Sequence, residues 1–224
     1  QLLIKLPHAL LIVAEEGLDS DALIRAIASS EETHSMYIQP EEGRVSIGVD
    51  QIRALTMKVR TYANRRRLAI INPAAAMTEQ SQNALLKLLE EPPEGLHIVI
   101  HARRADELLP TVTSRCQVLK MSRTSSTQDR QLIDSSQLDE QSRQQAMFLA
   151  AGRPDLIRRV VGDSELLANY RQLAVDAKAI IGPDRYESLR VADKYSKDRH
   201  SAVRLIDVIL TMINFQLKST GSAD

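Results

Sequence analysis

The sequence predicts an α/β fold, in which a doubly wound, mostly parallel five-stranded sheet is followed by an all-α region. Three observations support this prediction. Short aliphatic runs alternate with helical patterns up to about residue 120. The segment Ser122–Thr127 is polar throughout, which is typical of a linker. Every periodic segment after it has the spacing of an amphipathic helix.

The strands are expected at short, continuous aliphatic runs, because strands of a parallel sheet are buried on both faces. The strongest candidates are Ala9–Ala14, Leu68–Ile71 and His97–Ile100. Two weaker candidates are Met36–Gln39 and Gln117–Met121. The helices between them are expected at Ser20–Ala28, Val49–Ala63 and Thr78–Glu90. Thr78 suits the N-cap of the last helix, and Pro92-Pro93 ends it.

After the linker, helices are expected in six segments: Thr127–Ile133, Asp139–Ala150, Pro154–Val161, Ser164–Ile181, Arg185–Tyr195 and Ser201–Leu217. Gly152, Gly162 and Gly182 mark breaks between them. We therefore divide the chain into an α/β domain over residues 1–122, a small helical domain over 123–162 and a helical tail over 163–224.

The composition excludes several classes of function. The 224 residues carry 29 Lys and Arg and 29 Asp and Glu, so no whole-molecule basic field is available for DNA binding. The single Cys116 excludes an intramolecular disulfide and any zinc module that needs two thiolates. His97 and His101 lack the glutamate of a zinc-binding HExxH motif, so we expect no metal and no cofactor. The apolar run at 9–14 is too short to span a bilayer, and we expect a cytoplasmic location.

The loop after the first strand is the place where a doubly wound fold would bind phosphate. A loop of the form GxxxxGK[ST] wraps the phosphates with backbone amides and supplies a lysine and a hydroxyl. Here Ala14, Asp19, Ser20 and Asp21 occupy those four positions, and Gly17 is the glycine that remains. Four carboxylates stand in this degenerate loop, so we predict that it binds no ATP. It is then an ordinary acidic turn or a loop for a cationic ligand.

The end of the third strand lacks a second requirement of nucleotide hydrolysis. A carboxylate is needed there to hold magnesium. The chain reads Ile70-Ile71-Asn72-Pro73-Ala74 and contains no acid. The joint failure of two requirements of the same chemistry favours a lost active site over two unrelated changes.

Two segments, residues 78–93 (TEQSQNALLKLLEEPP) and 108–117 (LLPTVTSRCQ), resemble the corresponding stretches of AAA+ clamp-loader subunits. Residues 8–13, 46–53 and 151–154 are similar to further motifs of that family. The resemblance covers about residues 7 to 161. It implies a P-loop NTPase-like sheet domain, a helical lid over 123–162 and a shortened collar-like tail over 163–224. The four-cysteine zinc module of many family members is absent here.

The resemblance also implies a function. It points to a nucleotide-inert subunit of the bacterial replicative clamp loader, a component of the DNA polymerase III holoenzyme without ATPase activity of its own. Its partners would be ATPase subunits of gamma/tau type and a delta-type subunit, and indirectly the sliding clamp and primed DNA. The alternatives are an active ATP-hydrolysing subunit of the same loader, or a free-standing AAA+-derived scaffold or adaptor, which the short tail favours.

In this family the arginine of the Ser-Arg-Cys tripeptide acts on ATP bound by the adjacent subunit, and the resemblance implies that role for Arg115. A guanidinium is always charged and can fork two hydrogen bonds toward phosphate oxygens. An arginine supplied in trans raises the rate of phosphoryl transfer by about 10³ to 10⁵. Ser114 and Cys116 are expected to support the turn. The alternative is a surface arginine that caps a local turn or pairs with Glu107.

A first set of charged candidates lies at the end of the helix that is expected at Thr78–Glu90. Lys87, Glu90 and Glu91 are either an intersubunit contact surface or a solvated helix face. The arginine clusters at 65–67 and 103–104 are expected to be solvated surface rather than contacts to DNA phosphates.

The remaining candidates lie in the helical region. Arg153 and Arg158 stand near the family's sensor-2 position, and we expect a structural role for both because the loop at 14–21 is degenerate. The apolar residues from Val203 to Ile213 pack either on the rest of this chain or against other subunits.

Overall fold

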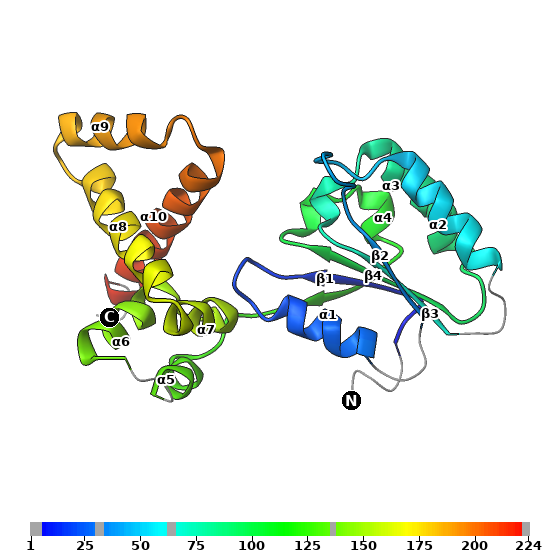
Figure 1. Ribbon diagram of the computed structural model, residues 1–224, viewed down its shortest axis with the longest axis horizontal. Coiled ribbons are helices and arrows are strands. Elements are labelled where there is room, and N and C mark those ends of the chain that lie inside the picture. Colours follow the sequence, from blue (N-terminus) through cyan, green and yellow to red (C-terminus); the bar gives the residue numbers. More distant parts are fainter. Residues whose placement is uncertain (1–5, 30–33, 62–65, 135–137, 221–224) are drawn as a thin grey trace. The chain divides into compact units, whose positions relative to one another are not determined.

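The computed structural model describes residues 6–29, 34–61, 66–134 and 138–220. The chain divides into two compact units, Gln1–Ser122 and Arg123–Asp224. The first unit is a sheet covered by helices, and the second is helical (Figure 1). The predicted division of the second unit at residue 162 remains a prediction, and one hydrophobic core extends across that position, from Ile133 to Met212.

The first unit is built on one five-stranded sheet with the order β2-β3-β4-β1-β5. Its strands are β1 (Ala9–Val13), β2 (His34–Ile38), β3 (Arg67–Ile71), β4 (Leu96–Ala102) and β5 (Gln117–Lys120). Each neighbouring pair is parallel, which confirms the predicted sheet. The weaker sequence signals belong to β2 and β5, which form the two edges and are only partly buried.

Helices cover both faces of the sheet. The helices of this unit are α1 (Ser20–Ser29), α2 (Val49–Thr61), α3 (Glu79–Glu90) and α4 (Pro110–Thr113), with 3-10 turns at Ala74–Ala76 and Ala105–Glu107. Helix α1 lies on one side of the sheet, and α2 and α3 lie on the other (Figure 1). Alternating strand residues therefore feed two separate cores, with Leu10 and Ile12 facing α1 and Leu11 facing α2 and α3.

The bounds of α3 follow from its caps, as the sequence predicts. The Thr78 hydroxyl accepts a hydrogen bond from the Ser81 amide at 3.2 Å, and the helix ends at Glu90, two residues before Pro92. Helix α2 is described as far as Thr61, and residues 62–63 of its predicted span lie outside the described residues.

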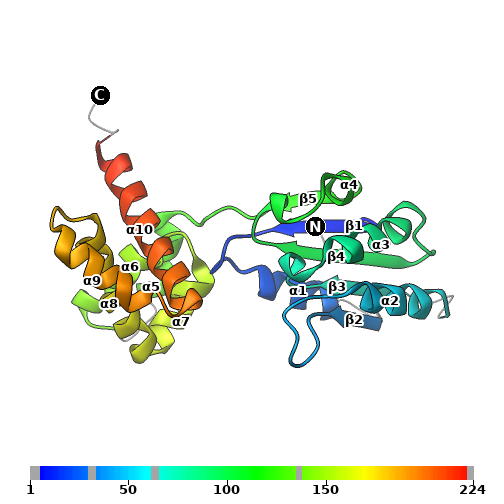
Figure 2. The ribbon, with the colours of Figure 1, turned by 90° about the horizontal axis from the view of Figure 1, so that it is seen from above.

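The second unit consists of α5 (Ser126–Asp134), α6 (Glu140–Leu149), α7 (Pro154–Gly162), α8 (Ser164–Ile181), α9 (Arg185–Tyr195) and α10 (Arg199–Thr220). Figure 2 shows α8, α9 and α10 as three successive helices joined by short turns. Seven predicted helix ends in this unit were wrong, six of them by one or two residues and the end of α10, which lies at Thr220 and not at Leu217, by three. Helix α5 begins inside the expected linker, α7 includes Gly162 because its break is set by the Asp163 cap of α8, and α10 begins at Arg199.

Candidate functional site

The degenerate loop at residues 14–21 uses its own backbone amides. The amides of Ala14, Leu18 and Ser20 donate to the carbonyl oxygens of Ala102, Glu15 and Leu18, at 3.0, 3.3 and 2.8 Å. Gly17 has a φ of +88°, which lets the loop close into this turn. A phosphate-binding loop points such amides at the ligand. In this chain three of the loop amides donate to carbonyl oxygens of the protein instead.

The charges around this loop oppose a polyphosphate as well. Glu15, Glu16 and Asp21 are exposed, and Ser20 is buried where a phosphate-binding loop has its lysine. Arg103, the cation from the end of β4, lies 2.9 Å from Glu16 and is paired with it. A unit charge about 4 Å from another contributes up to about 4 kcal/mol near a protein surface. The net field of the loop is therefore negative.

The end of β3 carries an amide where magnesium chemistry needs a carboxylate. The Nδ1 atom of His101 lies 2.8 Å from Oδ1 of Asn72, within hydrogen-bonding distance. Burial is the main cause that lowers the pKa of His101, which keeps the ring neutral at pH 7. His97 instead contacts the carbonyl of Pro7 at 3.0 Å. Among the residues that the structure describes, no group of three or more potential ligands could hold a metal ion.

Arg115 lies in the turn between α4 and β5 and is held at three points. Its Nη2 atom is 2.6 Å from Oε1 of Glu90, and its Nη1 atom donates to the Thr111 carbonyl at 3.0 Å and to the Ser114 hydroxyl at 3.4 Å. The side chain is 37% exposed. It does cap a local turn, but its acidic partner is Glu90. Glu107, the partner that sequence suggested, accepts from the amide of Arg103.

Buried groups fix the turn that carries Arg115. The side-chain oxygen of Gln82, which is buried on α3, accepts from the amide of Leu109 at 2.7 Å, just before α4. Cys116 packs against the core of the first unit, and burial raises the pKa of its thiol to about 11. Sequence reasoning missed Gln82. Its spacing of three and seven residues from Leu85 and Leu89 on the apolar face was the signal.

The loop at 14–21 and the turn of Arg115 lie at opposite ends of the strands of the sheet. The loop follows the carboxyl end of β1, whereas the turn precedes the amino end of β5. Leu10 is in register with Gln117, and β1 and β5 are parallel. At about 3.3 Å per residue, roughly 13 Å of strand separates the two. Arg115 therefore lies at the amino ends of the strands, opposite to the end that carries the loop of its own chain.

The other candidates on α3 lie on its surface. Lys87, Glu90 and Glu91 are exposed near the end of the helix, next to the turn of Arg115. Both interpretations made from the sequence, a contact surface and a solvated face, are compatible with this position. Glu90 joins the two groups of candidates through its ion pair with Arg115.

The described arginines of the two basic clusters differ in burial and in pairing. Arg103 and Arg104 are exposed and paired with Glu16 and Asp106. The prediction that Arg67 is solvated was wrong, because it is 2% exposed and donates to the carbonyl oxygens of Val59 and Glu94. A buried guanidinium persists when such acceptors satisfy it. Arg65 lies outside the described residues.

The two lid arginines differ in burial. Arg153 is buried, and its Nη2 atom donates to the carbonyl of Leu149 at 2.5 Å, so it joins α6 to the start of α7. Arg158 is exposed on α7.

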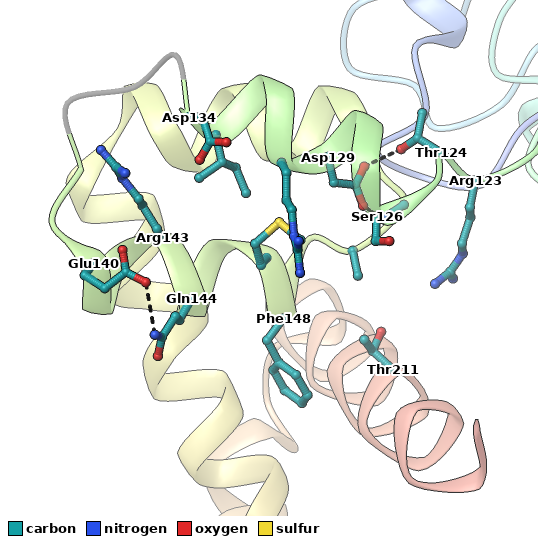
Figure 3. Close-up of a pocket in the computed structure, with 15 residues that line it drawn as sticks. Arg123, Thr124, Ser126, Asp129, Asp134, Glu140, Arg143, Gln144, Phe148 and Thr211 are labelled. Atoms are coloured by element: carbon teal, nitrogen blue, oxygen red, sulfur yellow. Dashed lines mark hydrogen bonds between the residues drawn. The ribbon is translucent and has the colours of Figure 1, made fainter. Parts of the chain in front are cut away.

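The helical unit contains a cavity of about 710 Å³, which sequence reasoning did not foresee. Figure 3 shows Thr124 and Asp129 joined at one side of it and Glu140 and Gln144 at another, with Phe148 and Thr211 on its wall. Gly152, with a φ of +74°, closes against Arg123, where an added Cβ would meet Arg123 Cβ at 2.7 Å. Charges of both signs line the cavity, and none of the sequence-predicted site residues does.

Helix α10 is apolar on two faces. Leu205, Val208 and Met212 are buried in the core of the helical unit. A second row of apolar side chains is 38–54% exposed and comprises Val203, Ile206, Leu210 and Ile213. One face therefore packs on this chain, which is the first alternative made from the sequence, and contact of the open face with another subunit remains a prediction. No described helix is long and apolar enough to cross a membrane.

A family model matches the part of the chain that holds α3 and the turn of Arg115. Residues 22–125 match the family model described as DNA polymerase III, delta subunit. The chain is 33% identical to DNA polymerase III subunit delta′ of Escherichia coli over 137 residues, which is 50% of this chain and 41% of that protein. It is 29% identical to subunit delta′ of Haemophilus influenzae, over 94% of this chain and 71% of that protein. The match thus spans less than half of the E. coli relative's length.

The solved structures agree on the fold. A DNA polymerase III gamma subunit-related protein of Thermotoga maritima has a TM-score of 0.51 at 20% identity, covering 93% of this chain and 75% of that one. A variant of the RuvB Holliday junction branch migration motor of the same organism has a TM-score of 0.61 at 12% identity, covering 93% and 81%. The chain therefore shares with these proteins a P-loop NTPase-like α/β fold followed by a helical part. The chain is therefore similar to DNA polymerase III subunits, and in particular to their delta′ subunits.

Proposed function

We propose that this chain is a delta′-like, nucleotide-inert subunit of the bacterial replicative clamp loader, and that it lends Arg115 to ATP bound by a neighbouring subunit. The neighbour would be an ATPase subunit of gamma/tau type, and a delta-type subunit would complete the contacts. The assembly would load the sliding clamp on primed DNA in the cytoplasm. The match of residues 22–125 to the DNA polymerase III family model and the similarity to delta′ subunits support the coarser part of this proposal.

The observation that carries the mechanism is the position of Arg115 at the amino ends of the strands. About 13 Å of strand separates it from the loop where its own chain would hold a nucleotide. A cation there can serve a phosphate that another chain brings. The side chain is partly exposed and keeps donors for a phosphate, since its contacts with Thr111, Ser114 and Glu90 occupy Nη1 and one hydrogen of Nη2.

The chemistry asked of Arg115 is electrostatic. Phosphoryl transfer spreads negative charge over the transferred group, and a guanidinium stabilises that charge with two parallel hydrogen bonds. The hydrogen bond from the Leu109 amide to Gln82 and the packing of Cys116 against the core fix the position of the turn. A rigid element therefore carries the guanidinium of Arg115. The open face of α10 suits a helix-to-helix contact between subunits, because Val203, Ile206, Leu210 and Ile213 repeat at intervals of three and four.

The catalytic part is tested by Arg115→Ala in a reconstituted loader. ATP hydrolysis at the interface with this subunit should fall by about 10³-fold, with the complex still assembled on gel filtration. Arg115→Lys should recover only part of the rate, because lysine keeps the charge and loses the fork. Unchanged hydrolysis in the alanine variant would remove the arginine from the mechanism.

The nucleotide-inert part is tested by titrating the chain with ATP and magnesium. Three loop amides already donate within the protein, and the field of the loop is negative. We therefore expect no saturable binding of ATP up to about 1 mM, which corresponds to a binding free energy weaker than about 4 kcal/mol. Saturable binding at micromolar ATP would favour an active ATPase subunit instead.

A further inference from the structure

The contact between Arg115 and Glu90 leads to an inference that rests on the proposed function and adds a regulatory step to it. We propose that Glu90 restrains Arg115 in the free subunit, and that a neighbour's phosphate must displace this carboxylate before the arginine can act. Arg115 would thus exchange one anion for another when the subunits dock.

The geometry distinguishes Glu90 from the other contacts of Arg115. Thr111 and Ser114 belong to the same turn as Arg115, so their contacts travel with it. Glu90 belongs to α3, and its Oε1 atom lies 2.6 Å from Nη2. It also ends that helix, where the unpaired carbonyl groups carry partial negative charge. The carboxylate therefore holds the guanidinium against α3, and the partial negative charge of the helix end favours a cation at this place.

The exposure of the pair makes it breakable. The side chains of Arg115 and Glu90 are 37% and 48% exposed. Ion pairs in such settings favour the closed arrangement by only about 1.4- to 5-fold. This is enough to populate one position of the guanidinium in the free subunit. A phosphate that carries more charge and accepts two parallel hydrogen bonds competes well against it.

The same population sets the size of the effect on docking. A binding-competent form that is only a fraction of the total lowers the apparent affinity by that fraction. Glu90→Gln keeps the shape of the side chain and removes its charge, so it should release Arg115. We therefore expect the concentration of this subunit that gives half-maximal ATP hydrolysis by the neighbouring subunit to fall by about two- to fivefold. The maximal rate should stay the same.

The experiment compares matched variants in the reconstituted loader. Glu79→Gln removes the same charge from the first turn of the same helix, about 16 Å away, and should change neither quantity. Glu90→Ala should behave like Glu90→Gln. Combining Glu90→Gln with Arg115→Ala should give no gain over Arg115→Ala alone, since the restraint acts through the arginine.

The outcomes separate the two proposals. If Arg115→Ala has no effect, the proposed function fails. If Arg115→Ala abolishes hydrolysis but Glu90→Gln leaves the half-maximal concentration unchanged or raises it, the restraint alone is overturned. A lower maximal rate in Glu90→Gln would also overturn the restraint, because the carboxylate would then be orienting the arginine for catalysis.

Discussion

Two ion pairs in this chain have similar geometry and different surroundings. Arg115 and Glu90 meet at 2.6 Å with both side chains well exposed. Lys194 and Asp176 meet at 2.7 Å, but the Asp176 side chain is only 9% exposed. Asp176 also accepts hydrogen bonds from the Tyr195 hydroxyl at 2.6 Å and the Gln172 amide at 3.0 Å. The comparison teaches that burial and extra donors, more than distance, decide whether a pair is structural or exchangeable.

The largest effect is expected at Asp176, which joins α8 to α9. Asp176→Ala would leave the donors of Lys194, Tyr195 and Gln172 without their acceptor, and we expect a loss of about 2–3 kcal/mol in the helical unit. Hydrogen exchange measured by mass spectrometry on α8 and α9 should report it. Asp163→Ala, the N-cap of α8, should cost only about 1 kcal/mol. A smaller effect at Asp176 than at Asp163 would break the comparison.

Acid should weaken the same junction. Burial raises the pKa of Asp176, but hydrogen bonds from Lys194, Tyr195 and Gln172 outweigh it and hold the pKa below its usual value. A carboxyl group whose pKa is lowered by folding stabilises the fold at a pH above its pKa in the unfolded chain, which is about 3.9. This contribution disappears as the pH falls through the pKa of the folded state. The stability difference between the wild type and Asp176→Asn should therefore shrink between about pH 5 and pH 2. A constant difference would contradict this assignment.

Gln82 should give an intermediate effect on the other side of the comparison. Gln82→Leu keeps the side chain buried and leaves the Leu109 amide without its acceptor, which costs about 1–2 kcal/mol. Hydrogen exchange should rise in residues 108–116, and hydrolysis at the interface should fall because Arg115 loses its rigid support. Exchange in α8 and α9 should not change. Equal protection in the mutant and the wild type would show that the turn is held by other contacts.

Local signals predicted most of the fold and part of the candidate site. Continuous aliphatic runs identified the three buried strands, and Thr78 with the two prolines at 92–93 fixed the bounds of α3. The degenerate loop was readable because each phosphate-binding position has a required residue type. The resemblance identified Arg115, whose role remains a prediction.

The failures concern long side chains that reach another element. Arg67 stands next to exposed Arg66 in a basic run, yet its guanidinium extends to the carbonyl of Val59 at the end of α2 and is buried. The same limit hid Glu90 as the partner of Arg115 and Asp176 as the partner of Lys194. Sequence spacing describes neighbours along one helix or strand, whereas these contacts depend on how two elements pack.

The smallest effect is expected where the exposed pair is broken, and it tests whether that pair can serve as a restraint. Glu90→Gln should change the stability of the full chain by less than about 0.5 kcal/mol, because solvent and salt screen a pair in which both side chains are over a third exposed. Urea unfolding of the wild type and Glu90→Gln at low and high salt measures this directly. A loss above about 1 kcal/mol would make the carboxylate part of the fold, as Asp176 is. A phosphate could then displace it only at the cost of that stability, and Arg115 would no longer be free to change partners.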